Sequence, residues 1–210
     1  MHAKGQAIHI DLPSVENNLP KLEFVMNRLL PNDIRLFNLT LAPATQPFFH
    51  ATASAIGKKY SYRFCVNKIV DPMRRRYTAH VYFPIDLRLL KDCLLLFEGT
   101  HDFNAFANNV VKTTKAYESK SLDFITIRTI YAIDLVDEED GYYCIYFHLK
   151  SALYRMVRNI VWSCLQVAAG DMEITHLRYL LHEAPGRLEN KAKSAPPEGL
   201  TLEHVYYENY

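Results

Sequence analysis

The chain has 210 residues, of which 49% are apolar and 22% are charged, and its formal net charge is +1 at pH 7. This length can bury a core as one large domain or two small ones, and the composition excludes a chain that is disordered throughout. No apolar run approaches the length of a membrane-spanning helix, and no signal-peptide pattern opens the chain.

The four cysteines are widely spaced and lie in apolar stretches, at Cys65, Cys93, Cys144 and Cys164. They form no CxxC pair and show no zinc-ligand spacing, so we expect buried free thiols in a reducing, intracellular compartment that the sequence does not define further. The nine histidines are scattered, and the chain has no GxGxxG motif and no P-loop. We therefore expect neither a metal nor an organic cofactor.

Alternating and helical patterns follow one another in the first part of the chain. Residues 6–11 alternate and predict a strand that ends before Pro13. Leu22, Val25, Met26 and Leu29 have helical spacing, and Pro31 closes that helix. Residues 34–41 are a second strand candidate. A longer strand is predicted over 59–70, with Tyr60, Tyr62, Phe64 and Val66 on one face and Lys59, Ser61, Arg63 and Cys65 on the other.

Stronger signals come later in the chain. Residues 77–83 predict a strand, and Asp86 is a plausible N-cap for a helix through Phe97, with Gly99 as its C′ residue. Residues 125–136 and 142–150 predict a hairpin, joined by an acidic link that ends in Gly141. Further elements are helices over 155–169 and about 175–183 and a last strand over 200–207.

This order of elements predicts an α+β fold with an antiparallel or mixed sheet and helices packed on one face. The chain shows no repeat, no low-complexity tract and no obvious linker. We therefore expect residues 1–210 to form a single unit, with no separable second domain.

Basic residues gather at a few places although the net charge is small. Arg74, Arg75 and Arg76 form the densest run, and Lys58 with Lys59 is a second group. Local basic patches, more than net charge, decide the affinity for phosphates, so these five residues are candidates for RNA binding. A solvated charged turn is an equally good interpretation of the arginine run taken alone.

Four segments, in this order and at these spacings, resemble the tRNA pseudouridine synthases of the TruA family. They are Met1-His2-Ala3-Lys4-Gly5-Gln6, Phe97-Glu98-Gly99-Thr100-His101-Asp102-Phe103, Met156-Val157-Arg158-Asn159-Ile160-Val161 and Ala195-Pro196-Pro197-Glu198-Gly199-Leu200. Shorter matches such as Phe49-His50-Ala51 extend the resemblance through essentially the whole chain. Two positions depart from it: Thr52 replaces an arginine, and Ala152 replaces a phenylalanine near the uracil pocket.

The resemblance implies that the nucleophile lies outside these residues. The family carries its catalytic aspartate in an Arg-Thr-Asp-x-Gly-Val-His-Ala stretch, of which Met1-His2-Ala3 matches the last three residues. We therefore expect an N-terminally truncated pseudouridine synthase fold, inactive as it stands. The alternative is a catalytically inactive RNA-binding protein that has kept the fold.

The resemblance also assigns roles to two residues of this chain. Arg158 would pair with the family's aspartate, and a guanidinium inside an apolar helix should in any case reach a carboxylate or a phosphate. Tyr60 would lie against the target uracil. The alternative interpretation is that Tyr60 is a core aromatic residue on a strand face, with no role at the uracil. The implied substrate is uridine in the anticodon arm of tRNA, and the implied assembly is a homodimer.

Two other acidic positions are poor candidates for chemistry. His101-Asp102 lies among Phe97, Phe103 and Phe106, which indicates a packed helix end and a structural role. Asp11 falls in a predicted strand beyond the family's catalytic loop. Without the elements that precede Met1 in the family, we expect the strand at Gln6–Asp11, or one near it, to have an open edge and the chain to be poorly soluble.

Overall fold

The computed structural model describes residues 1–12, 18–42, 48–108 and 126–207. They belong to two compact units, the larger made of Met1–Gln6 with Ile56–Tyr210 and the smaller of Ala7–Ala55. Among these residues, no helix has both the length and the apolar character needed to cross a membrane.

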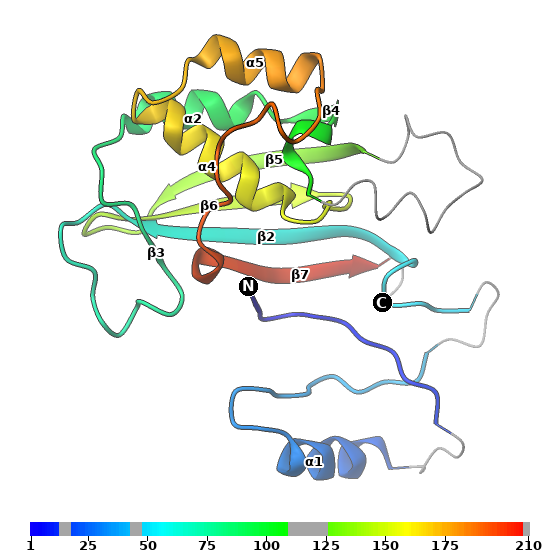
Figure 1. The fold of residues 1–210 in the computed structure, drawn as a ribbon. Coiled ribbons are helices and arrows are strands. Elements are labelled where there is room, and N and C mark those ends of the chain that lie inside the picture. The colour runs from blue at the N-terminus through cyan, green and yellow to red at the C-terminus, as the bar shows by residue number, and fades with distance from the viewer. Residues whose placement is uncertain (13–17, 43–47, 109–125, 208–210) are drawn as a thin grey trace. The chain divides into compact units, whose positions relative to one another are not determined.

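The larger unit is built on a mixed sheet, which contains seven strands in the described part of the chain (Figure 1). The main path has the order β1-β7-β2-β6-β5-β4, and β3 pairs with β2. The strands are β1 (His2–Ala3), β2 (Ala55–Cys65), β3 (Ala79–His80), β4 (Gly99–Asp102), β5 (Ile127–Asp137), β6 (Tyr142–Leu149) and β7 (Leu200–Tyr207). The β1–β7 and β2–β3 pairs are parallel, whereas β2–β6, β6–β5 and β5–β4 are antiparallel.

Helices of the larger unit cover one side of this sheet (Figure 1). They are α2 (Leu87–Leu95), α4 (Met156–Ala168) and α5 (Ile174–His182), with short 3₁₀ turns η1 (Asn104–Phe106) and η3 (Pro197–Gly199). Helix α4 is the most deeply buried, with ten of its thirteen residues in the core, and α2 packs against it. The predicted α+β class, with helices on one face of a mixed sheet, is confirmed.

Local signals in the sequence account for several element ends. The Asp86 carboxylate accepts hydrogen bonds from the backbone N–H groups of Arg88 (2.8 Å) and Leu89 (3.2 Å), so it caps α2 as predicted. Gly170 follows α4 with a φ of 83°, a left-handed conformation that glycine adopts without strain. Gly99 does not cap α2, which ends at Leu95. It instead opens β4 with a φ of 104°.

The predicted hairpin is the β5–β6 pair. Its turn has positive φ angles at Glu139, Asp140 and Gly141, which is why an acidic, glycine-ended link suits it. Strand β6 also pairs with β2, where Tyr60 lies opposite Phe147 and Tyr62 opposite Ile145. The β5–β6 register shifts between Ile130 and Ala132, which marks a β-bulge at Tyr131.

Two strand predictions near the N-terminus are wrong. Residues 6–11 form no strand, and the pairing with β7 is made instead by His2–Ala3. Residues 34–41 also form no strand, because side chains of the preceding helix satisfy their backbone. The side-chain nitrogen of Asn27 donates a hydrogen bond to the carbonyl of Leu36 (2.7 Å), and its side-chain oxygen accepts one from the N–H of Leu36 (2.8 Å). The Glu23 carboxylate accepts from the N–H of Leu39 (2.8 Å).

That helix, α1 (Leu19–Leu29), belongs to the smaller unit. The Asn18 side chain caps it by accepting from the N–H of Lys21 (3.0 Å), and Pro20 stands in its first turn, where proline is tolerated. The helix ends before Pro31, as its spacing predicts.

Candidate functional site

Arg158 lies in the first turn of α4 and joins two of the four motif segments. Its Nε donates a hydrogen bond to the carbonyl of Ala195 (2.5 Å), and the N–H of Ala195 donates to the carbonyl of Arg158 (3.1 Å). Arg155, at the helix N-cap, has a left-handed φ of 63°. The start of α4 and the segment before η3 are therefore held together at the arginine that the sequence singles out.

The charge of Arg158 is only partly compensated by its surroundings. Burial and the neighbouring Arg155 lower the pKa of the Arg158 guanidinium, while Tyr62 and Glu198 act in the opposite direction. Among the described residues, Arg158 forms no salt bridge, and its two terminal nitrogens donate no hydrogen bond. These nitrogens are therefore available to a carboxylate or a phosphate oxygen.

Tyr62 links β2 to the same segment. Its side chain is fully buried, and its hydroxyl donates a hydrogen bond to the carbonyl of Pro196 (3.0 Å). Burial raises the pKa of this hydroxyl, with Glu198 acting in the same direction and Arg158 against it. Tyr62 thus lies within electrostatic reach of Arg158, although 96 positions separate the two in the chain.

Tyr60 lies two residues before Tyr62 on the same side of β2, as the alternation predicts. It is 9% exposed, and burial raises the pKa of its hydroxyl. The fold therefore brings the strand of Tyr60 to the N-terminal end of the helix of Arg158. That Tyr60 and Arg158 line one cleft stays a prediction.

The other side of β2 carries a polar network. Arg63 reaches Glu138 (Nε–Oε1, 3.1 Å) and Glu203 (Nη1–Oε1, 3.2 Å). The Ser61 hydroxyl donates to Glu203 (2.5 Å), and Lys4 lies 2.9 Å from the second oxygen of that carboxylate. These side chains of alternating positive and negative charge form one cluster, which connects β2, β7 and the Met1–Gln6 motif.

The Met1–Gln6 motif is also fixed at His2 and Gly5. The protonated Nε2 of His2 donates to the carbonyl of Arg76 (2.7 Å), and its ring lies 4.5 Å from that of Tyr77. A Cβ added to Gly5 would meet the carbonyl oxygen of Glu203 at 2.8 Å, so only glycine permits this close approach. The motif is thus held between β7 and the arginine run.

The five predicted RNA-binding residues form two separate groups. Lys58 and Lys59 stand near the start of β2, where the Lys59 ammonium lies 4.7 Å above the Tyr146 ring. Arg74, Arg75 and Arg76 are exposed in the turn before β3. The Arg74 guanidinium lies 4.4 Å above the ring of Tyr142, which pairs with Cys65 at the opposite end of β2. The strand therefore separates the two groups by about 20 Å.

His101 and Asp102 have local roles. Nε2 of His101 donates to the carbonyl of Glu98 (2.9 Å), and the Asp102 carboxylate accepts from the N–H of Asn104 (2.9 Å). The segment is strand β4 followed by a 3₁₀ turn, not a helix end. The four cysteines are buried and free, as expected.

Sequence reasoning missed two of these features. The Lys4–Glu203–Arg63 cluster joins residues up to 199 positions apart, and its signal was the polar alternation of Ser61 and Arg63 on β2. Buried Asn159 was also missed, although it stands inside a motif segment. Its amide donates to the carbonyl of Phe106 (2.6 Å) and to Asn108 (2.8 Å).

Comparisons with known proteins give a consistent result. The family described as tRNA pseudouridine synthase matches residues 94–208. The chain is 37% identical over 209 residues to the tRNA pseudouridine synthase A 1 of Protochlamydia amoebophila, covering 100% of this chain and 76% of that protein. It is 34% identical to the tRNA pseudouridine synthase A of Latilactobacillus sakei (99% and 77% covered) and 34% identical to that of a Geobacillus species (100% and 77% covered).

Proposed function

This chain belongs to the tRNA pseudouridine synthase family, and from that premise we propose that it isomerises uridine to pseudouridine in the anticodon arm of tRNA as part of an active enzyme. The reaction breaks the C1′–N1 bond, rotates the base and rejoins it through C5. The observation that carries the proposal is the placement of Arg158, a partly buried guanidinium whose terminal nitrogens are available beside Tyr62 and Glu198.

Arg158 is proposed to orient the catalytic carboxylate. A guanidinium can donate two parallel hydrogen bonds to a carboxylate, which would fix its direction and keep it ionised. The hydrogen bond from Nε to Ala195 leaves the terminal nitrogens for this pairing and restrains the arginine's direction.

Tyr60 is proposed to lie against the target uracil. Its aromatic ring suits a base that has left its stack, and the buried Tyr62 beside it fixes the strand to the Pro196 segment. Lys58, Lys59, Arg74, Arg75 and Arg76 are proposed to contact tRNA phosphates. The proposed assembly is a homodimer in which both units of the chain act as one catalytic domain, without a metal or cofactor.

No residue of the 210 matches the family's catalytic aspartate, so the chain is proposed to be inactive when assayed alone. The test is release of tritium from tRNA that carries 5-³H-uridine. We expect no release by residues 1–210 and release by the same chain preceded by the family's Arg-Thr-Asp-x-Gly stretch. A matched extension with asparagine in place of that aspartate serves as the control.

Each outcome decides one part of the proposal. Turnover by the 210 residues alone would overturn the assignment of the nucleophile. A folded, tRNA-binding extended chain without turnover would favour the second candidate, an RNA-binding protein that has lost catalysis. The similarity to the Protochlamydia relative, which covers the whole chain, supports either reading, so the activity of the extended chain is the discriminating measurement.

A further inference from the structure

The arginine run (Arg74, Arg75 and Arg76) and the Met1–Gln6 motif meet at the side chain of His2. The carbonyl of Arg76 can only accept, so Nε2 of His2 carries a proton and donates the hydrogen bond between them (2.7 Å). The His2 ring also lies 4.5 Å from the ring of Tyr77, the residue that follows the run. All of these residues belong to the larger unit. The second residue of the chain is thus bonded to the turn that carries its densest positive charge.

The turn that carries the arginine run is held by its own backbone and by β6. The N–H of Arg74 donates to the carbonyl of Asp71 (3.0 Å), and the N–H of Tyr77 donates to the carbonyl of Arg74 (2.9 Å). The hydroxyl of Tyr142 accepts from the N–H of Asp71 (3.0 Å), and the Arg74 guanidinium lies 4.4 Å above the Tyr142 ring. Because the turn is stiffened in this way, a displacement of its arginine side chains should reach the Arg76 carbonyl.

The positive charge of the run is almost uncompensated. All three arginines are exposed. Within the described ranges, Arg75 and Arg76 form no salt bridge, and Arg74 forms one long contact, 4.0 Å from Asp71. Exposed guanidinium groups bind phosphate oxygens through charge-assisted hydrogen bonds. A phosphate bound here would therefore act on a turn whose backbone is bonded to His2.

The motif on the other side of this bond is held by β7. His2 and Ala3 pair with Thr201 and Leu202, and the N–H of Lys4 donates to the carbonyl of Leu202 (2.8 Å). Met1 is 64% exposed, so the contacts that hold the motif begin at His2. The proposed function places the catalytic carboxylate a few residues before Met1. Among the described residues, His2 is therefore the anchor nearest to that carboxylate in sequence.

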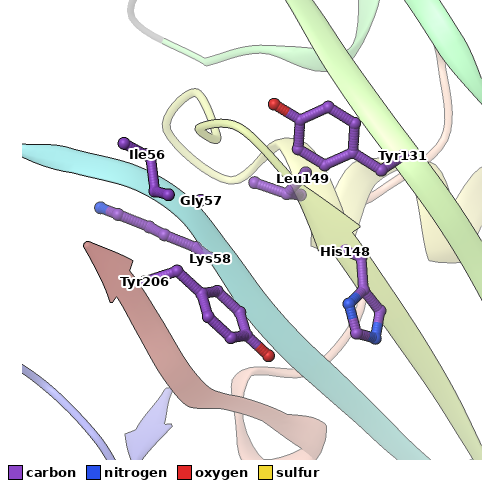
Figure 2. A pocket seen from close by; sticks show the side chains of 7 residues that line it. All are labelled: Ile56, Gly57, Lys58, Tyr131, His148, Leu149 and Tyr206. Carbon is purple, nitrogen blue, oxygen red and sulfur yellow. The ribbon is translucent and has the colours of Figure 1, made fainter. Parts of the chain in front are cut away.

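The lysine pair at the start of β2 lies far from the motif. Figure 2 shows the hollow lined by Lys58, at the start of β2, and by Tyr206, near the end of β7. A Cβ added to the adjacent Gly57 would lie 3.6 Å from Cδ2 of Tyr206. Thr201, the partner of His2, lies five residues earlier on β7, which is about 17 Å along a strand. Phosphate binding at the lysine pair therefore serves as a comparison for binding at the arginine run.

We propose that His2 is a positioning residue, which couples RNA phosphate bound at the arginine run to the orientation of the catalytic carboxylate. The proposal rests on the proposed function, because it takes the ligand to be tRNA and the carboxylate to precede Met1. His2 acts through the backbone of the motif and takes no part in the bond changes at the uridine. Binding of tRNA at the turn thus completes the active site.

Two substitutions separate the hydrogen bond of His2 from its ring. His2→Phe keeps an aromatic ring and loses the donor, whereas His2→Gln loses the ring and keeps an amide nitrogen that can donate to the Arg76 carbonyl. His101→Phe is the matched control. Nε2 of His101 also donates to a carbonyl, that of Glu98 (2.9 Å), and its ring lies 6.0 Å from that of Phe103.

The first experiment follows the backbone amide signals of Lys4 and Gly5 by NMR while tRNA is added to the 210-residue chain. We expect these signals to shift in the unmodified chain and in His2→Gln, and to keep their unbound positions in His2→Phe at saturating tRNA. Filter binding should give His2→Phe the same tRNA affinity within about threefold, because its phosphate contacts are intact. Replacing the three arginines by alanine should abolish the shift. Replacing Lys58 and Lys59 should weaken binding but leave the shift at saturation.

The second experiment measures tritium release by the chain extended with the family's Arg-Thr-Asp-x-Gly stretch. We expect His2→Phe to lower kcat by roughly 10- to 100-fold with little change in KM, since misplacing a reacting group by about 1 Å can cost about 100-fold. His2→Gln should recover most of kcat, and His101→Phe should keep both constants. Similar melting of the two phenylalanine variants would show that a loss confined to His2→Phe arises in the active site.

The outcomes separate this proposal from the proposed function. If the extended chain is inactive but tRNA shifts the motif signals through His2, the coupling stands and the isomerase function falls. If the extended chain is active and His2→Phe has the same kcat, the positioning role is overturned and the isomerase function stands. Absence of tRNA binding would overturn both.

Two further results would overturn the coupling alone. Motif signals that shift equally in His2→Phe and in the unmodified chain would show that RNA reaches the motif without the His2 hydrogen bond. A loss of kcat that His2→Gln does not recover would assign the effect to the ring of His2 and not to its donor.

Discussion

Arg158 and Ala195 exchange two hydrogen bonds across 37 positions of sequence, one through the arginine side chain and one between their backbones. The side-chain bond fixes the guanidinium, and the backbone bond fixes the segment that leads to η3. The candidate catalytic arginine is therefore also a structural support of the motif that follows it.

Arg158→Lys should loosen this support. A lysine keeps the charge but has no donor at the position of Nε, so the bond to Ala195 is lost. We expect the free energy of unfolding to fall by about 1 kcal/mol, since the site is only partly buried, and the amide protons of Ala195, Glu198 and Gly199 to exchange faster. Urea unfolding and hydrogen exchange measure the two effects. Arg155→Lys is the control, because the Arg155 side chain lies over the Tyr154 ring, where both are exposed. Equal exchange in both variants would contradict the role given to Arg158.

Asn159→Ala should be much more costly. The buried Asn159 amide donates to the Phe106 carbonyl and to Asn108, and its oxygen accepts from the Ser194 hydroxyl (2.5 Å). Its removal leaves buried polar groups without partners, so we expect a loss of about 2–3 kcal/mol in the free energy of unfolding. Gln166→Ala on the exposed side of the same helix should change it by less than about 0.5 kcal/mol. Comparable urea midpoints for the two variants would show that the Asn159 network is dispensable.

Glu203 should make stability depend on pH. Burial acts to raise the pKa of the Glu203 carboxyl, but hydrogen bonds from Ser61, Lys4 and Arg63 outweigh it and lower the pKa below its usual value. A carboxyl whose folded pKa is depressed stabilises the fold above its unfolded pKa, and this contribution is lost as pH falls through the folded value. The unfolded pKa is about 4.3, so the loss should begin below about pH 5.

Thermal unfolding between pH 3 and pH 7 measures this contribution. We expect Glu203→Gln to lower stability at pH 7 by about 1–3 kcal/mol and to flatten the acid limb of the profile. Glu138→Gln is the matched control, since the Glu138 carboxylate, in the described part of the chain, is bonded to Arg63 only and is more exposed than that of Glu203. If the acid limb of Glu203→Gln matched that of the unmodified chain, other carboxyls would be responsible for it.

The sequence predicts those elements whose signals are local. Three such features are predicted correctly: the bounds of β7, the Asp86 cap and the turn that ends in Gly141. Each depends on a few neighbouring residues that by themselves favour the observed structure. Residues 34–41 alternate as a strand does, yet Asn27 and Glu23 supply the hydrogen bonds that a partner strand would have given. Alternation alone does not reveal which partner the backbone will find.

For the candidate site, too, the sequence predicts some features and not others. Arg158 and Tyr60 are recognised because their neighbours match family motifs. The contacts around them are not, because Tyr62 meets Pro196 over 134 positions and Ser61 meets Glu203 over 142.

The two basic groups should contribute independently to tRNA binding. They lie about 20 Å apart along β2, which exceeds the Debye length of about 8 Å at physiological salt. Replacing Lys58 and Lys59 by alanine, or Arg74, Arg75 and Arg76 by alanine, should each weaken binding and make the plot of log affinity against log salt less steep. Each lost phosphate contact reduces the slope by roughly 0.7–0.9, so the variant with all five replacements should show the sum of the two changes. Lys91→Ala on the exposed side of α2 should leave the slope unchanged. An unchanged slope in the fivefold variant would identify these residues as a solvated surface, and tRNA contacts would then have to be sought elsewhere on the chain.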